Sequence, residues 1–406
     1  MSRRIVLCPI GTRGDFEPML ALAKGLQSAG WSPVLCAAPR FEAEASGIEF
    51  VTLAHDDQAF NAARVQPWQG LRAVFADAVN AQARALLEAT RDGAAMILGG
   101  SGLHFAGPTI AEARRIPFRL AVLSPPVMPS RELGPPIANW SPATPRAVLR
   151  AGWRAMSLAF DHLVRAPLDA QRAHLGLGPV REPILAHLHG RRPLMAVDPE
   201  LSPIPLGSPV GTVQTHAWRL ERPAMPLPQE VLAFLKAGAP PMFVGFGSDV
   251  HSTSDPRRVI ELVVAAARRV RQRVVIATPI KVVADDVLTV KFVDHAALFP
   301  HVSLVVHHGG AGVVQTCARA GVPQLAVPHM TDLFFWGHRI KALGLGPAPV
   351  VLSALTESRL VAHLQNTLRT NAYRLQARAL AAALNGVNGV SEAVAELTVS
   401  MCGSSD

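Results

Sequence analysis

The chain has 406 residues, of which 49% are hydrophobic, and a formal net charge of +9. This length exceeds one ordinary hydrophobic core, so two domains of roughly 200 residues are expected. No run of about 18 apolar residues occurs, which excludes a transmembrane helix from the prediction. The first apolar run, Ile5–Cys8, is short and leads into a glycine turn, so we expect a first strand and not a signal peptide.

Cysteine spacing and charge distribution narrow the cellular context and the partners. The four cysteines are Cys8, Cys36, Cys317 and Cys402, and none forms a Cys-x-x-Cys pair. A disulfide framework or zinc site is therefore not expected, and we expect a cytoplasmic protein. Arginine is dispersed and only 5% of residues are aromatic, so we expect no nucleic-acid partner. The net positive charge is attributed to arginines on solvated helix faces. The alternative is weak peripheral attraction to an acidic membrane surface. A monomer or homodimer is expected.

Apolar runs and helical segments alternate along the first half of the chain. We predict strands at 5–10, 33–37 and 94–98, and helices at 17–29 and 107–115. This alternation is typical of a parallel sheet covered by helices. Residues 125–145 are rich in proline and contain Trp140; long loops in compact domains are often functional.

A second proline-rich zone, at 199–228, marks the domain boundary, and the alternation then restarts. Strands are predicted at 241–244, 274–277, 302–306 and 324–327, and a helix at 255–270. The expected architecture is two doubly wound α/β domains in series with a cleft between them.

The loop Gly11–Pro18 directly follows the first expected strand. Ligands of open α/β sheets bind at the carboxyl ends of strands. Asp15 in this loop has two interpretations: an N-cap of the next helix, worth about 1 kcal/mol, or a general base. One carboxylate can serve both purposes.

The stretch Val305–Gly312 is a β-branched run followed by two histidines and a cluster of small residues. A helix is predicted over Val313–Ala320, closed by Gly321 and Pro323. A strand, a glycine turn and a helix in this order point backbone N–H groups and the positive end of the helix dipole at an anion. We therefore expect a diphosphate site to which His307 donates a hydrogen bond, the alternative being an ordinary tight turn.

Two further loops follow predicted strands. Gly245–Ser248 offers close backbone approach and the Ser248 hydroxyl as a phosphate donor, and Pro328–Leu333 contains Asp332. Asp332 is suited to accept hydrogen bonds from sugar hydroxyls, or to cap a helix that begins near Phe334. No metal site is expected, because the acidic pairs in the chain have no histidine at ligand spacing. A serine hydrolase is not expected either, because the chain contains no Gly-x-Ser-x-Gly elbow.

Taken in this order, the loops resemble those of the two-domain (GT-B) glycosyltransferases of family 1, with sterol-type glucosyltransferases and antibiotic glycosyltransferases nearest by motif. The matching segments span nearly the whole chain: Gly11–Pro18, Phe243–Ser248, Val293–Pro300, His307–Gly312, Phe334–Arg339 and Leu343–Pro347. The resemblance implies an α/β GT-B fold of two Rossmann-like domains facing a central cleft. It implies an acceptor-binding domain at 1–207, a nucleotide-sugar-binding domain at 208–385, and a C-terminal helix and tail at 386–406 that returns toward the first domain.

The resemblance also implies roles for individual residues. Asp15 is the implied base, and the implied nucleotide site lies near Val293 and His295. Asp332 is implied to read sugar hydroxyls, while Leu333 stands where the family pattern has glutamine. The diphosphate is implied to be held by His307, Gly310, Ala311 and Gly312, with help from Ser248. The resemblance also implies donor binding by Gly14, Gly247 and Gly309.

The expected function is a metal-independent, inverting transfer of sugar from a UDP- or dTDP-linked donor to a hydroxyl of a hydrophobic acceptor, of sterol, lipid, polyketide or phenolic type. The nucleotide sugar is a co-substrate, and no other cofactor is expected. Acceptor-binding candidates are Trp68, Phe75, His104 and Trp140, with core packing as the alternative. Leu333 and the pair Val313-Val314 depart from the family pattern, which predicts either a deoxysugar donor or weak donor binding. They alone favour the alternative function, a nucleotide-sugar-binding auxiliary protein with little or no transferase activity.

Overall fold

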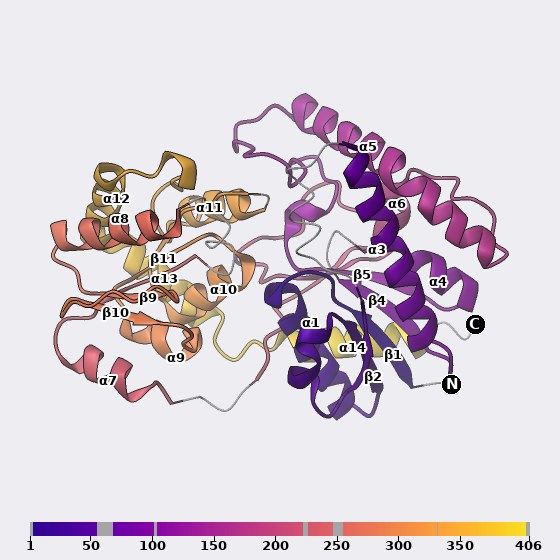
Figure 1. Cartoon of the computed structure of the whole chain (residues 1–406), viewed down its shortest axis with the longest axis horizontal. Helices are drawn as coiled ribbons and strands as arrows, with labels where there is room; N and C mark the ends of the chain where they lie inside the picture. Colours follow the sequence, from indigo (N-terminus) through magenta and orange to yellow (C-terminus); the bar gives the residue numbers. More distant parts are fainter. Residues whose placement is uncertain are drawn as a thin grey trace. The chain divides into compact units, whose positions relative to one another are not determined.

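The computed structural model describes residues 3–54, 68–100, 104–221, 226–246, 255–330 and 332–402. These residues form two compact units (Figure 1). Within the described ranges, the first unit comprises Met1–Pro135, Thr144–Glu221 and Asn388–Asp406, and the second comprises Pro136–Ala143 and Arg222–Val387. The chain thus contributes a short piece of the proline-rich loop to the second unit before it returns to complete the first.

The first unit is built on a seven-stranded parallel sheet with the order β3-β2-β1-β4-β5-β6-β7. Its strands are β1 (Arg4–Cys8), β2 (Ser32–Ala37), β3 (Glu49–Thr52), β4 (Met96–Gly100), β5 (Phe118–Val122), β6 (Leu194–Ala196) and β7 (Val213–Thr215). The strands expected at 5–10, 33–37 and 94–98 are confirmed as β1, β2 and β4. β7 lies beyond the boundary expected after residue 207, and the first unit extends to Glu221.

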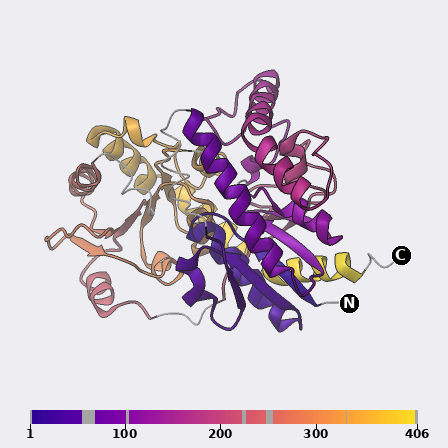
Figure 2. The same cartoon turned by 45° about the vertical axis from the view of Figure 1, so that its right-hand side comes forward.

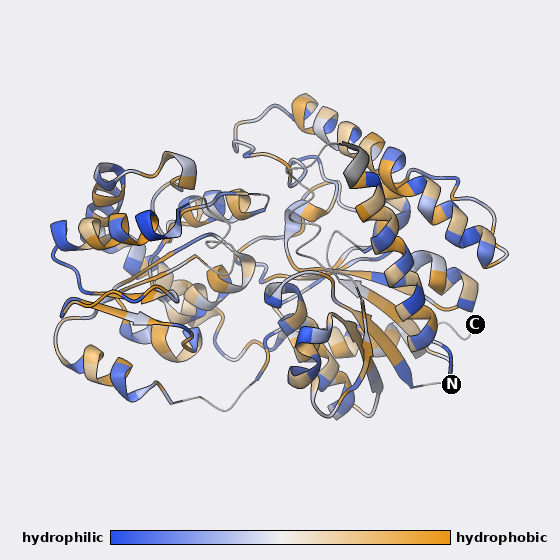
Figure 3. Ribbon diagram, in the orientation of Figure 1, coloured by the Kyte–Doolittle hydropathy of each residue, from blue (hydrophilic) through white to orange (hydrophobic). Residues whose placement is uncertain are grey.

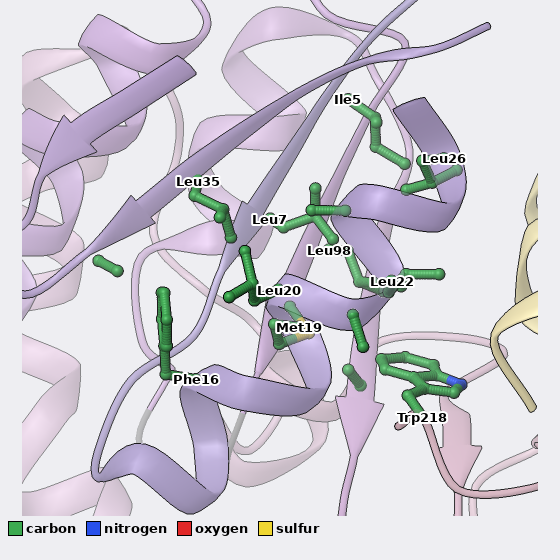
Figure 4. Close-up of a cluster of buried hydrophobic side chains, with 14 of the residues drawn as sticks. Ile5, Leu7, Phe16, Met19, Leu20, Leu22, Leu26, Leu35, Leu98 and Trp218 are labelled. Carbon is green, nitrogen blue, oxygen red and sulfur yellow. The ribbon is translucent and has the colours of Figure 1, made fainter. Parts of the chain in front are cut away.

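Helices cover both faces of this sheet, so its strands are apolar on both sides. The helices are α1 (Arg13–Ser28), α3 (Trp68–Ala89), α4 (Gly107–Arg114), α5 (Arg146–His174), α6 (Ile184–His189) and α14 (Gly389–Cys402), with 3-10 turns η1 (Pro39–Ala45) and η2 (Pro125–Val127). Side chains alternate along β1: Ile5 and Leu7 pack with Phe16 and Leu20 of α1, whereas Val6 joins the core on the opposite face (Figure 4).

The last described helix, α14, packs against α1 of the first unit, as Figures 1 and 2 show. The contact is close, because a Cβ added at Gly25 of α1 would overlap Val390. Buried Arg119 on β5 donates from Nη1 to Glu396 across 2.8 Å. His216 lies 2.8 Å from Glu392 through its Nδ1. These contacts attach the C-terminal helix to the N-terminal sheet.

The second unit contains a five-stranded parallel sheet with the order β10-β9-β8-β11-β12. Its strands are β8 (Met242–Gly245), β9 (Val274–Ala277), β10 (Val287–Val290), β11 (Leu304–His307) and β12 (Gln324–Ala326). Four of the five follow the predicted positions; β10 was not predicted. His307 at the end of β11 pairs with Gly245 on one side and with Ala326 on the other.

Helices again enclose the sheet, and hydropathy colouring shows apolar strands beneath partly polar helices (Figure 3). The helices are α7 (Gln229–Lys236), α8 (Pro256–Arg269), α9 (His295–Leu298), α10 (Ala311–Ala320), α11 (Leu333–Ala342), α12 (Glu357–Arg369) and α13 (Asn371–Ala383), with turns η4 (Phe299–His301) and η5 (Leu352–Ala354). Within the described ranges, no helix combines the length and apolarity needed to span a bilayer. The expected pair of Rossmann-like sheets is confirmed.

Candidate functional site

Strand order identifies one place in each sheet where a ligand is expected. In the first sheet the order reverses between β1 and β4, and in the second it reverses between β8 and β11. At such switch points the loops leave in opposite directions and open a crevice at the carboxyl ends of the strands. Asp15 lies in the first turn of α1, just after β1. Residues 308–310, between β11 and α10, form what we call the glycine turn.

The loop after β1 holds Asp15 by hydrogen bonds in a capping box. Helix α1 begins at Arg13 with Thr12 as its N-cap, so Asp15 occupies the third helical position and is not itself the cap, contrary to the expectation from sequence. Oδ2 of Asp15 accepts the Thr12 N–H at 2.9 Å. Gly11 has φ 126°, and a Cβ there would overlap the Asp15 carboxylate. Only glycine therefore fits beneath this side chain.

The Asp15 side chain is half-buried in the first turn of α1, at the positive end of the helix dipole. Arg40 donates to the carbonyl of Gly11 at 2.7 Å and so holds the loop that precedes α1. Gly14, which immediately precedes Asp15 in α1, donates its N–H to the Thr12 hydroxyl at 3.3 Å. The arrangement presents a fixed carboxylate at the switch point of the first sheet.

In the second unit, the turn after β11 leaves the start of α10 uncapped. Gly310 is the N-cap of α10 and makes no side-chain cap hydrogen bond. The first intrahelical bond runs from the N–H of Val314 to Gly310, so the N–H groups of Ala311, Gly312 and Val313 have no helical acceptor. Gly312 is exposed, with open space where a Cβ would stand. This helix start is suited to an anion.

His307 does not provide the phosphate contact that the sequence led us to expect. Its side chain is 0% exposed. Nδ1 accepts the N–H of Gly309 at 3.0 Å, and Nε2 lies 3.0 Å from Oε1 of Gln324. Burial, followed by the effect of neighbouring His308, lowers the pKa of His307 to about 3. The ring is thus neutral at pH 7 with both nitrogens engaged inside the unit.

The segment after β10 buries Val293 and only partly exposes His295. Val293 is buried in the apolar core beneath the sheet. His295 stacks on Phe299 with ring centroids 4.7 Å apart, and burial lowers its pKa to about 4. Asp294 caps α9 by accepting the N–H of Ala296 at 2.8 Å. This segment therefore exposes the side chains of Lys291 and Phe292, together with the partly exposed edge of His295.

The start of α11 lies directly against the glycine turn. Asp332 is the N-cap of α11 and is half-buried, and Leu333 is 7% exposed. Gly309 has φ 97°, and a Cβ there would lie 2.8 Å from the carbonyl oxygen of Leu333. The candidate residues for phosphate and for sugar are therefore adjacent, and glycine is required where they meet.

The second unit also receives the loop residues Pro136–Ala143, which include Trp140. Nε2 of His338 on α11 lies 3.0 Å from Oδ1 of Asn139. This contact was not predicted, because Asn139 and His338 are 199 residues apart and no local pattern relates them. Trp140 is half-buried in that segment.

Two acceptor-binding candidates belong to the core instead. Phe75 is 6% exposed and packs against Phe105 with ring centroids 5.4 Å apart. His104 is 1% exposed, stacks on Phe118, and fills the space left by Gly99 and Gly107. Both side chains therefore pack in the core and are not available to bind an acceptor, because their neighbours are apolar or lack side chains. Gly247 and Ser248 lie outside the described residues, and nothing is described of the Trp68 side chain.

Known proteins match both halves of the chain. Residues 5–130 match the "Glycosyltransferase family 28 N-terminal domain", and residues 261–398 match the "Erythromycin biosynthesis protein CIII-like, C-terminal domain". Glycosyltransferase GtfE from Amycolatopsis orientalis is 33% identical, over 85% of this chain and 85% of the relative. Sterol 3-beta-glucosyltransferase UGT80B1 from Arabidopsis thaliana is 27% identical, over 96% of this chain and 67% of the relative.

Solved structures show the same fold. Glycosyltransferase VinC, crystallised with dTDP, superposes with a TM-score of 0.70 at 20% identity, over 98% of this chain and 99% of VinC. The chain belongs to the GT-B glycosyltransferases, in the family that includes these antibiotic and sterol enzymes. It is accordingly an enzyme of the glycosyltransferase class, as the sequence resemblance implied.

Proposed function

We propose that this glycosyltransferase uses a UDP- or dTDP-linked sugar and transfers it, with inversion, to a hydroxyl of a hydrophobic acceptor without a metal ion. The observation that carries the donor class is the uncapped start of α10, where the N–H groups of Ala311, Gly312 and Val313 converge beside an open position. Backbone N–H groups and a helix dipole stabilise a diphosphate both when bound and as it leaves. They take the place of a cation in neutralising the leaving group.

In the proposed reaction, Asp15 removes the proton from the acceptor hydroxyl. The acceptor oxygen bonds to the anomeric carbon while the bond between that carbon and the diphosphate oxygen breaks. The proton goes to Asp15, and the electron pair of the broken bond goes to the nucleoside diphosphate. A single displacement of this kind inverts the anomeric centre. The capping box supports this role, because it fixes the carboxylate in position before the substrate arrives.

The acceptor class rests on the relatives. One family match is named for erythromycin biosynthesis, and one relative glucosylates sterols. We therefore propose an apolar or polyketide-like alcohol as acceptor. Asp332 and Leu333, at the start of α11, are the proposed sugar-facing residues, while the segment near Val293 and His295 is proposed to receive the nucleotide base.

Transfer can be tested by incubating the purified chain with UDP-glucose, dTDP-glucose and a dTDP-deoxysugar, each with a panel of sterols, macrolide aglycones and phenols. Mass spectrometry should show one acceptor gaining a sugar, and NMR of the product should show the opposite anomeric configuration to the donor. Binding of donor with no transfer to any acceptor would favour the auxiliary, binding-only function. A product that keeps the donor's configuration would refute the single displacement.

A further inference from the structure

A chain of three buried hydrogen bonds runs beneath the glycine turn. The N–H of Gly309 donates to Nδ1 of His307 at 3.0 Å, Nε2 of His307 meets Oε1 of Gln324 at 3.0 Å, and Nε2 of Gln324 reaches the carbonyl of Val314 at 3.4 Å. His307 and Gln324 are both 0% exposed. Neither side chain therefore presents an atom to solvent or to a ligand in this structure.

The chain of bonds fixes the protonation of the imidazole. Because Nδ1 accepts the Gly309 N–H, it carries no proton, and a neutral ring must carry its proton on Nε2. That proton is donated to the amide oxygen of Gln324. The amide cannot easily turn over, because its nitrogen donates to Val314 on the other side. Gln324 thus selects the tautomer in which His307 can hold Gly309.

The turn is confined from the opposite side as well. The backbone of Leu333 packs on Gly309, leaving no room for a Cβ. Gly309 is consequently held between the His307 ring and the start of α11. The next residue, Gly310, is the N-cap of α10. The backbone conformation of Gly309 therefore sets the orientation of the N–H groups at the start of α10.

We propose that Gln324 is a positioning residue for the donor diphosphate: through His307 it fixes the glycine turn, and the turn aims the N–H groups of Ala311, Gly312 and Val313. This inference rests on the proposed function, since it assumes that a diphosphate binds at α10. Gln324 and His307 themselves touch neither phosphate nor sugar. Their effect is on affinity and orientation, because small displacements of a positioned group cost large factors in rate.

Side-chain mimics distinguish this role from a direct contact. The amide oxygen of asparagine falls near the place of Nδ1 in histidine, whereas the amide of glutamine falls near Nε2. His307→Asn keeps an acceptor for the Gly309 N–H, and we expect its affinity for UDP or dTDP to stay within about threefold of the wild type. His307→Gln and Gln324→Met should weaken that affinity by about 5- to 10-fold, the size of one neutral hydrogen bond.

The control is Ser303→Ala, just before the opposite end of β11, where the hydroxyl lies in the same unit and bonds Pro241 at 3.2 Å and Gln272 at 3.1 Å. It removes buried hydrogen bonds remote from the turn, so we expect a lower melting temperature with unchanged diphosphate affinity. Calorimetric titration with UDP and dTDP provides the readout, and acceptor KM should stay unchanged in all variants.

The outcomes separate cleanly. Retained affinity in His307→Gln with loss in His307→Asn would show that Nε2 reaches the phosphate and would overturn the proposal, as would wild-type affinity in Gln324→Met. If the wild type itself binds neither diphosphate, the proposed donor class fails, and this inference fails with it. Loss in Gln324→Met and His307→Gln, with rescue by asparagine, supports it.

Discussion

The backbone N–H of Thr12 donates to Oδ2 of Asp15 across 2.9 Å, while Thr12 is itself the N-cap of the helix that carries Asp15. The carboxylate proposed as the base is therefore also part of the fold of its own loop. Substitutions at this position affect both roles, and the experiment must separate them.

Asp15→Asn keeps an oxygen that can accept the Thr12 N–H, so we expect the melting temperature to change little. It removes the basic carboxylate, and turnover should fall by about 100-fold or more. Glu42→Gln, an exposed carboxylate in the same unit, is the control and should be as active as the wild type. An Asp15→Asn enzyme with near-normal turnover and an intact fold would remove Asp15 from the mechanism.

Gly309→Ala should destabilise the second unit and abolish diphosphate binding. Alanine at φ 97° is strained, and its Cβ would stand 2.8 Å from the Leu333 carbonyl oxygen; we expect a loss of about 1–3 kcal/mol in the free energy of unfolding. Gly47→Ala is matched for strain alone, with φ 84° and no neighbour within 4 Å. It should cost less and leave binding unaltered. Equal costs for the two would show that contact with Leu333 is unimportant.

The free energy of unfolding should begin to fall as the pH drops below 6.5 and should continue to fall toward pH 4. Burial lowers the pKa of His104 and His307 to about 3 and that of His295 to about 4. An unfolded histidine titrates near 6.5, so below that pH the unfolded chain binds more protons than the folded chain. The stabilisation is complete above pH 6.5 and is lost as the pH falls toward the folded values, at up to about 1.4 kcal/mol per pH unit for each histidine.

His104→Phe tests this pH dependence directly. Phenylalanine keeps an aromatic ring against Phe118 but cannot titrate, so the free energies of unfolding measured with denaturant at pH 7 and pH 5 should differ less than in the wild type. His301→Gln, an exposed position, should leave the difference unchanged. If His104→Phe shows the full wild-type pH difference, His104 does not contribute to it.

Leu333→Gln tests donor choice. Leucine is 7% exposed at the start of α11 and offers an apolar surface where the family pattern has a hydrogen-bonding amide. We expect the wild type to prefer a deoxysugar donor and the variant to shift toward UDP-glucose, since an unpaired buried amide costs about 1–3 kcal/mol. Competition between two donors, read by mass spectrometry, gives the ratio. A wild type that already prefers UDP-glucose, with no shift in the variant, would place residue 333 outside the sugar site.

Chelation should not alter the rate. In the proposed mechanism, N–H groups at the start of α10 neutralise the leaving diphosphate, so turnover measured in EDTA should equal turnover in buffer. Activity that disappears in EDTA and returns with magnesium or manganese would contradict the metal-free mechanism. Addition of calcium alone controls for non-specific ionic effects.

The sequence by itself determined the two parallel sheets and the positions of the two switch-point loops. Local patterns suffice for these, because β-branched runs, glycine turns and helical periodicity act over a few residues. β9 was placed at its observed bounds, and Asp15 and the glycine turn were found because they follow directly on predicted strands. The family followed from motifs spread over both halves.

Only the tertiary structure decided what each side chain touches. The sequence around His307 predicts a hydrogen-bond donor to phosphate. In the structure its side chain is buried and bonds Gln324, 17 residues away. His104 and Phe75 are likewise buried in the core, because packing depends on residues brought together by folding. The contact between Asn139 and His338 joins positions 199 residues apart. Such contacts carry no local signature, since they arise when elements distant in sequence pack together.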